Sequence, residues 1–260
     1  MYIKPYDELT IQDNFIFQKV MRNKRICKQT IERLLDIDIK DISYPEEEKS
    51  INVRLDSKSI RLDVYVNDDR GTVFNIEMQT TKDMDELVKR TRYYQGLIDI
   101  DNIEKGQNYS ALHDTYIIFI CTFGVFTGKR HKYTIRNLCI EGNEILLNDG
   151  TAKLFLSTKG EADDVSKPLK MFLDYVDGKK PEDALMQEID HEVDTVKHCD
   201  EWRRDYMTLA LEMDKKWREG KAEGKIEAIR NAIKDGLTTL AAVKKSGRYT
   251  EEEIAAIAAP

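Results

Sequence analysis

The chain has 260 residues, with 48 acidic and 41 basic side chains and a formal net charge of −7. This length is sufficient for one α/β domain with an appendage. The charge balance excludes a protein that coats nucleic acid through a general basic surplus, although positive charge can still be concentrated locally.

The predicted elements alternate between helices and strands. Residues 1–40 are expected to be mostly helical. The strand pattern then recurs near residues 51–55, 60–66, 72–80, 115–123, 132–140 and 152–157, with one helix over 83–99. The run 115–123 is apolar enough for a strand that is buried on both faces. This order predicts a mixed sheet flanked by helices.

From residue 165 onward the pattern becomes helical, with helices expected over 167–177, 181–195, 200–233, 237–242 and 250–255. Thr250 and Glu253 have the spacing of a capping box. We therefore predict a core over 1–165, a helical extension over 166–233 and a small helical tail over 234–260. The tail resembles a helix-turn-helix in outline, but it is small and not markedly basic, which favours a role in packing, oligomerisation or regulation.

The long predicted helix over 200–233 contains Gly220 and Gly224. Each glycine costs about 1 kcal/mol relative to alanine within a helix. The helix is therefore expected either to continue through them with solvent on all sides or to hinge there.

The most informative segment is a predicted hairpin with strands near 60–66 and 72–80. Both strands alternate apolar with polar residues. With Val66 opposite Thr72, one face of the hairpin carries Asp63, Asn75, Glu77 and Gln79.

In this register Asp63 lies opposite Asn75 and diagonal to Glu77. Diagonal neighbours are about 7–8 Å apart at Cα, close enough for two carboxylates to share a cation. An amphipathic hairpin with one solvated acidic face explains the same pattern equally well.

The order Asp63, then Glu77-Met78-Gln79, resembles the PD-(D/E)xK nuclease core with glutamine in place of lysine. More closely, the chain resembles the recombination-promoting nucleases, also described as PD-(D/E)xK nuclease-family transposases. The resemblance covers roughly residues 1–215 and is carried by segments 13–20, 75–79, 89–94, 105–109, 116–120, 158–160 and 169–175. It implies a restriction-endonuclease-like α/β core and a metal-dependent DNA endonuclease associated with recombination or mobile elements.

The resemblance also implies roles for individual residues. Asp63 and Glu77 would be catalytic carboxylates that bind Mg²⁺ or Mn²⁺, with the carbonyl of Met78 as a further ligand. Gln79 would take the position of the lysine. A glutamine has no charge and cannot act as a base, but its amide can hold a water molecule.

Three further residues are additional candidates for the site. Asp13 is one, because the first helix of such nucleases often supplies a carboxylate, although capping is the commoner use of Asp near a helix start. On helix 83–99, Arg90 with Tyr93 or Tyr94 could contact a phosphate, and the resemblance favours Arg90 and Tyr93. Complementarity to the helix dipole accounts for part of this helix's charge pattern.

The remaining charge pattern bears on the partners of the protein. Basic clusters within 19–28 and 129–132 could line a DNA groove or form solvated surfaces. A homodimer through the C-terminal helices would suit double-strand cleavage. The alternative function is a catalytically inactive, nuclease-fold protein that binds DNA or acts as an oligomeric scaffold.

The cysteines and the apolar runs bear on the compartment. Cys27, Cys121, Cys139 and Cys199 are scattered without a C-x-x-C pair, which predicts reduced thiols and argues against a zinc site. The sequence has no apolar leader pattern and no run of bilayer-spanning length. A cytoplasmic protein without membrane association is therefore expected.

Overall fold

The computed structural model describes residues 2–44, 50–51, 60–142 and 144–259. The chain forms two compact units, one of residues 7–199 and one that joins residues 1–6 to residues 200–260. The boundary expected near residue 165 lies inside the larger unit, because helices α4 (Lys167–Val176) and α5 (Ala184–Lys197) belong to it.

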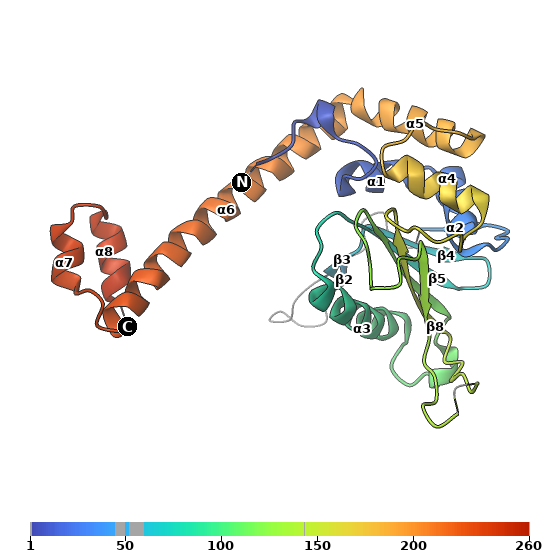
Figure 1. Cartoon of the computed structure of the whole chain (residues 1–260), viewed down its shortest axis with the longest axis horizontal. Coiled ribbons are helices and arrows are strands. Elements are labelled where there is room, and N and C mark those ends of the chain that lie inside the picture. Colours follow the sequence, from blue (N-terminus) through green and yellow to red (C-terminus); the bar gives the residue numbers. More distant parts are fainter. Residues whose placement is uncertain (1, 45–49, 52–59, 143, 260) are drawn as a thin grey trace. The chain divides into compact units, whose positions relative to one another are not determined.

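The larger unit is built on a six-stranded mixed sheet in the order β1-β4-β5-β6-β8-β7 (Figure 1). The strands are β1 (Ile42–Ser43), β4 (Val64–Asp68), β5 (Val73–Gln79), β6 (Thr115–Cys121), β7 (Lys132–Ile135) and β8 (Thr151–Ser157). Strands β5, β6 and β8 are parallel to one another, whereas β1, β4 and β7 pair antiparallel with their neighbours. A separate antiparallel pair consists of β2 (Ser50–Ile51) and β3 (Ile60–Arg61).

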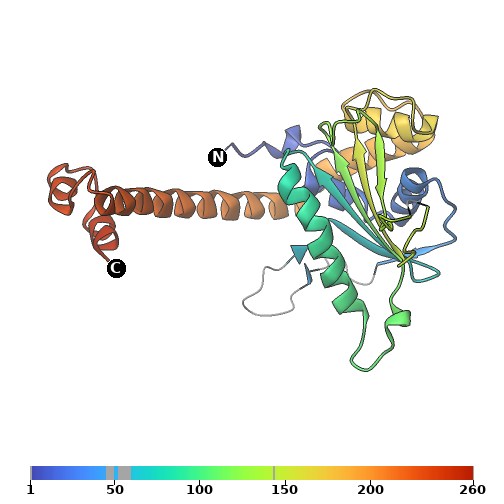
Figure 2. The ribbon, with the colours of Figure 1, turned by 60° about the horizontal axis from the view of Figure 1, so that its bottom comes forward.

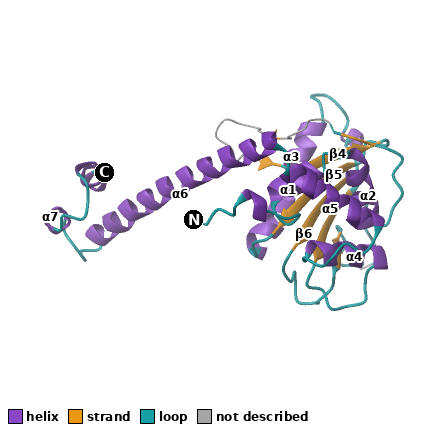
Figure 3. Ribbon diagram, turned by 90° about the horizontal axis from the view of Figure 1, so that it is seen from above, coloured by secondary structure: helices purple, strands orange, loops and turns teal. Residues whose placement is uncertain are grey.

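Helices lie on both faces of the six-stranded sheet (Figure 3). Besides α4 and α5 they are α1 (Asn14–Val20), α2 (Lys24–Leu35) and α3 (Met84–Asn102), with short 3₁₀ turns at η1 (Tyr6–Glu8) and η2 (Tyr109–Ala111). The predicted α/β fold with a mixed sheet between helices is confirmed. Strand β6 is buried along its length except for the half-buried Tyr116, as its apolar sequence predicts.

The β4–β5 hairpin differs from the predicted register by two residues. Val66 lies opposite Phe74 instead of Thr72. The cause is the turn: Asp68 accepts hydrogen bonds through Oδ1 from the amides of Arg70 and Thr72, at 2.9 and 2.8 Å, and so extends the pairing. Gly71 closes the turn with a φ of +84°, which an L side chain adopts only under strain. A shift of two residues keeps every side chain on its predicted face.

Helix α3 packs over the face of the sheet that carries Glu77. It begins after Asp83, whose side chain accepts a hydrogen bond from the amide of Glu86 at 3.0 Å. The core on this face is continuous and contains Leu62, Tyr65, Val73, Leu87, Tyr94, Leu97, Ile98, Ile117, Phe119, Cys121, Val125 and Phe155. The polar face of the predicted hairpin therefore lies beneath a helix, with Asn75 and Glu77 buried and Asp63 and Gln79 half-buried.

Other parts of the sheet also differ from expectation. Strand β1 was not predicted, because it contains only two residues. Strand β7 ends at Ile135, short of the expected residue 140. Residues 52–55 of the strand expected near 51–55 lie outside the described part of the chain.

The smaller unit contains helix α6 (Asp200–Lys234), followed by α7 (Leu240–Lys245) and α8 (Glu251–Ala258). Figure 2 shows α7 and α8 at the C-terminal end of α6, where Lys225 and Glu253 form an ion pair at 3.0 Å. Helix α6 is unbroken at Gly220 and Gly224, so it does not hinge there. The predicted capping box of Thr250 and Glu253 is confirmed. Among the described helices, none is long and apolar enough to cross a bilayer.

Candidate active site

The two predicted carboxylates meet at the open end of the β4–β5 hairpin. Beyond the last pair, Val64 with Ile76, continuation of the ladder brings Asp63 opposite Glu77. The amide of Asp63 donates to Oε1 of Glu77 at 3.1 Å, and Oδ2 of Asp63 accepts from the amide of Met78 at 3.1 Å. The corrected register thus brings the two side chains closer than the predicted diagonal arrangement does.

Glu77 is the buried member of this pair. Its side chain is only 2% exposed. Burial, and then the negative charge of Asp63, hold the pKa of Glu77 well above its ordinary range. The buried Asn75 amide, in the orientation that satisfies its neighbours, donates to Oε1 of Glu77 at 3.2 Å. Two carboxylates in such contact form a strong site for positive charge.

Arg90 of α3 supplies a positive charge at this point. One guanidinium nitrogen donates to Oε1 of Gln79 at 3.0 Å, and the other approaches Oε2 of Glu77 at 3.3 Å. The second nitrogen also donates to the hydroxyl of Tyr94 at 2.7 Å. Burial raises the pKa of Tyr94 to about 12, with a further contribution from the charge of Glu77. Tyr94 therefore stays protonated and holds Arg90 against the sheet.

The main chain of Met78 also faces Asp63. The carbonyl of the next residue, Gln79, accepts from Thr122 at 3.0 Å and so points toward β6. In a strand, the amide and the carbonyl of one residue point to the same edge, and those of the next residue point to the opposite edge. Because the Gln79 carbonyl points toward β6, both main-chain groups of Met78 point toward β4 and Asp63. The Met78 carbonyl is thus directed to the β4 edge of β5, the side on which Asp63 lies, while the Met78 side chain is buried.

Gln18 of α1 is a site residue that was not predicted. Its amide nitrogen donates to Oδ1 of Asp63 at 2.8 Å. The sequence offers no signal for this contact, because it depends on how α1 docks against the hairpin, 45 residues further along the chain.

The structure does not bring Asp13 or Tyr93 into the group around Glu77. The carboxylate of Asp13 accepts from the amide and the hydroxyl of Thr10, at 2.7 and 3.2 Å, and closes the turn before α1. Tyr93 is 39% exposed, whereas Tyr94 is 6% exposed and contacts Arg90. The spacing of four residues between Arg90 and Tyr94 was the better signal.

The two basic clusters are largely neutralised by neighbouring carboxylates. In the first, Lys24 pairs with Asp41 at 2.7 Å, Lys28 pairs with Glu32 at 2.7 Å, and Arg25 pairs with Glu188. In the second, Lys129 pairs with Glu161 at 2.8 Å, Arg130 lies 3.8 Å from Asp164, and His131 is buried against the same Asp164. These contacts favour a structural role for both clusters over a DNA groove.

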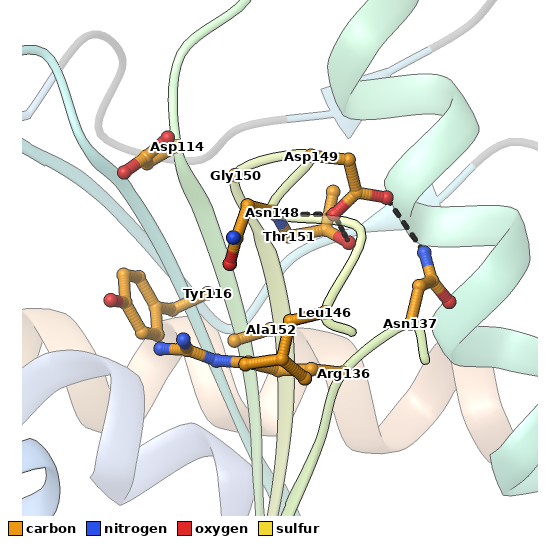
Figure 4. Close-up of a pocket in the computed structure, with 10 residues that line it drawn as sticks. All are labelled: Asp114, Tyr116, Arg136, Asn137, Leu146, Asn148, Asp149, Gly150, Thr151 and Ala152. Carbon is orange, nitrogen blue, oxygen red and sulfur yellow. Dashed lines mark hydrogen bonds between the residues drawn. The ribbon is translucent and has the colours of Figure 1, made fainter. Parts of the chain in front are cut away.

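A polar cavity of about 170 Å³ lies elsewhere, where β6 and β8 begin (Figure 4). Its wall is fixed by Asp149, which accepts from Asn137 at 2.6 Å and from the hydroxyl of Thr151 at 2.9 Å. Tyr116 lines the cavity and stacks on Phe74, which places it on the opposite face of the sheet from Glu77. The cavity contains none of the predicted site residues.

The oxygen ligands around Asp63 fit a hard divalent cation. Within residues 2–44, 50–51, 60–142 and 144–259, no group of three or more His, Cys, Asp or Glu side chains is placed to hold a metal ion. Two carboxylates and a carbonyl are nevertheless sufficient for Mg²⁺, which usually keeps several water ligands. Burial, and then the charge of Asp63, raise the pKa of Glu77, and a cation bound between the two carboxylates would lower it.

A mixed sheet that presents an aspartate beside a Glu-x-Gln strand defines a protein of the PD-(D/E)XK nuclease class. The family model for PD-(D/E)XK nuclease family transposases matches residues 14–153, more than half of the chain, and the chain belongs to this family. The family comprises nucleases associated with mobile elements, for which DNA is the implied substrate and divalent metals are generally used. No curated protein and no solved structure matches the chain.

Proposed function

We propose that the protein is a metal-dependent DNA endonuclease that hydrolyses phosphodiester bonds during recombination or the movement of mobile elements. The observation that carries this proposal is the contact between Asp63 and Glu77 beside Gln79 and Arg90. Glu77 is buried, while Asp63, Gln79 and Arg90 are partly exposed and can meet a substrate.

In this proposal Asp63, Glu77 and the Met78 carbonyl would hold Mg²⁺ or Mn²⁺, and Gln18 would fix the orientation of Asp63. The bound cation would lower the pKa of a water molecule and neutralise charge on the phosphate. The water oxygen bonds to phosphorus, the bond from phosphorus to the leaving oxygen breaks, one proton passes to solvent, and the leaving oxygen gains one from solvent. Arg90 can donate to a phosphate oxygen as its ion pair with Glu77 loosens.

The experiment is nicking of supercoiled plasmid DNA by the full chain in Mg²⁺, in Mn²⁺ and in EDTA. We expect conversion to open-circular and linear DNA with either metal and none in EDTA. Absence of cutting with every metal would overturn the proposal and favour the alternative, an inactive nuclease-fold protein that binds DNA or forms an oligomeric scaffold. Cutting in EDTA would contradict the metal dependence alone.

We also propose that α6 mediates a homodimer, which would bring two nuclease sites to one DNA molecule. Four large apolar side chains on α6 are exposed: Met207 (54%), Leu211 (66%), Met213 (39%) and Trp217 (41%). Charge is divided along the helix, with five acidic and two basic residues over 200–214 and three acidic and seven basic over 215–234. An antiparallel second copy of α6 would place the acidic half against the basic half, so a second copy is the partner proposed.

Light scattering coupled to size-exclusion chromatography tests the dimer. We expect the mass of a dimer at low salt and a smaller average mass in 0.5 M NaCl. Salt screens exposed charges, with a Debye length of about 10 Å at 0.1 M and about 3 Å at 1 M, and so weakens the attraction between the two helices. The double substitution Leu211→Glu and Trp217→Glu should give a monomer, whereas Leu237→Glu, at a residue that is 80% exposed outside α6, should not. A monomeric wild-type protein at every concentration would contradict the proposal.

A further inference from the structure

From the resemblance of Glu77-Met78-Gln79 to the PD-(D/E)XK motif, Gln79 stands where the motif has lysine. A lysine provides two things at such a site, a positive charge and several N–H donors on one flexible stem. Glutamine keeps donors but has no charge. The structure around Gln79 shows where the missing charge is found.

The guanidinium of Arg90 lies directly against the Gln79 amide. One nitrogen donates to Oε1 of Gln79 at 3.0 Å, while the other lies 3.3 Å from Glu77. Arg90 is itself held from behind: its guanidinium stacks over the rings of Tyr94 and Phe119, at 5.2 and 5.6 Å from their centroids. Arg90 is therefore fixed beside the strand position where a lysine would otherwise place its charge.

This contact decides which way the Gln79 amide points. A guanidinium has donors only, so the amide oxygen must face Arg90 and the amide nitrogen must face away. Among the described residues, the Gln79 nitrogen has no hydrogen-bond partner, and the side chain is only half-buried. Its two N–H groups thus face away from Arg90 and are available to an acceptor on a substrate.

Arg90 also carries a permanent charge. A guanidinium is protonated throughout the physiological pH range, unlike a lysine, whose charge can be lost when it is buried. The cation remains 27% exposed beside the fully enclosed Glu77, so it can be shared with an approaching phosphate.

We propose that Arg90 and Gln79 together replace the lysine of the PD-(D/E)XK motif. Arg90 supplies the positive charge and orients the amide, and Gln79 donates an N–H to a non-bridging oxygen of the scissile phosphate. The inference rests on the proposed nuclease activity, and it makes the pair one functional unit contributed by two neighbouring elements, β5 and α3.

The test is a double-mutant cycle on cleavage of a short DNA duplex with Mg²⁺. Gln79→Leu and Arg90→Met should each lower kcat/KM by about 10²–10³-fold, the usual effect of losing one donor to developing negative charge. The kcat/KM of the double variant Gln79→Leu/Arg90→Met should lie within about threefold of that of the slower single variant, because the two residues act as one unit.

Rescue provides the stricter measurement. Adding Gln79→Lys to Arg90→Met should raise kcat/KM at least tenfold above that of Arg90→Met alone, since one lysine restores both the charge and the donors. If Arg90 had a merely structural role, a lysine introduced at residue 79 would not restore the rate of Arg90→Met.

Arg92→Met is the matched control, because Arg92 is exposed on the same helix and lies outside the group around Glu77. It should cleave at the wild-type rate. Additive losses in the cycle, or a Gln79→Lys/Arg90→Met variant that is folded but no faster than Arg90→Met, would overturn the replacement. A wild-type protein that never cuts overturns the proposed nuclease instead, and the inference with it.

Discussion

Asp63→Asn is expected to reduce metal-dependent DNA cleavage by about 10³-fold, which corresponds to about 4 kcal/mol of transition-state stabilisation. Asparagine preserves the shape of the side chain and can still accept the hydrogen bond from the Met78 amide. It removes the negative charge that a hard divalent cation requires. The loss should therefore appear in cation binding and turnover, with little change in Tm.

The measurement is plasmid nicking at several Mg²⁺ concentrations, together with titration of Mn²⁺ by isothermal calorimetry in the absence of DNA. Asp85→Asn is a suitable control, since Asp85 is an exposed carboxylate in the first turn of α3. It should retain both cation binding and cleavage. Wild-type affinity for Mn²⁺ in Asp63→Asn would remove Asp63 from the cation site.

Glu77→Gln is expected to abolish cleavage and, in EDTA, to make the protein more stable near neutral pH. Burial and the charge of Asp63 raise the pKa of Glu77 above its unfolded value. The folded protein therefore binds a proton more tightly than the unfolded chain, and stability falls as pH rises from the ordinary glutamate pKa through the raised one. Glutamine is neutral at every pH and removes this loss.

Thermal unfolding of both proteins in EDTA between pH 4 and pH 8 tests this prediction. The two Tm values should be similar at the acidic end. As pH rises, the Tm of Glu77→Gln should exceed that of the wild type, by roughly 2–4 °C for each kcal/mol of difference in the free energy of unfolding in a domain of this size. Arg90 opposes the effect but remains bonded to Gln79 and Tyr94 in the variant. Addition of Mg²⁺ should stabilise the wild type alone. A Glu77→Gln protein less stable than wild type across the range would mean that the ion pair with Arg90 dominates.

The sequence predicted the elements that hold the candidate site because their periodicity is strong. Alternation in 60–80 reflects the pleat of the hairpin, and the acidic start of α3 reflects its N-terminal cap at Asp83. The hairpin register was wrong by two residues because a side chain, Asp68, determines where the turn begins. Since side chains alternate between the two faces with a period of two, a shift of two residues leaves each side chain on the face that was predicted for it.

Other features depend on tertiary packing and were not accessible from local patterns. Burial of the polar face follows from α3 docking over β5, and the Gln18 contact follows from α1 docking against the hairpin. The choice between Tyr93 and Tyr94 is set by which side of α3 faces the sheet. The assigned roles of Asp63, Glu77, Met78 and Gln79 remain predictions until the variants are measured.

The closeness of the site residues along the chain has a consequence for folding. Apart from Gln18, the side chains that meet at Glu77 all lie between Asp63 and Tyr94, in one hairpin and the helix that follows it. Closing such short loops costs little chain entropy, and local contacts are typical of rapid folding steps. The later strands β6 and β8 must instead pair across long crossovers. The polar contacts of the candidate site are thus local in the chain, whereas the Phe119 ring that backs Arg90 is added only when β6 pairs with β5.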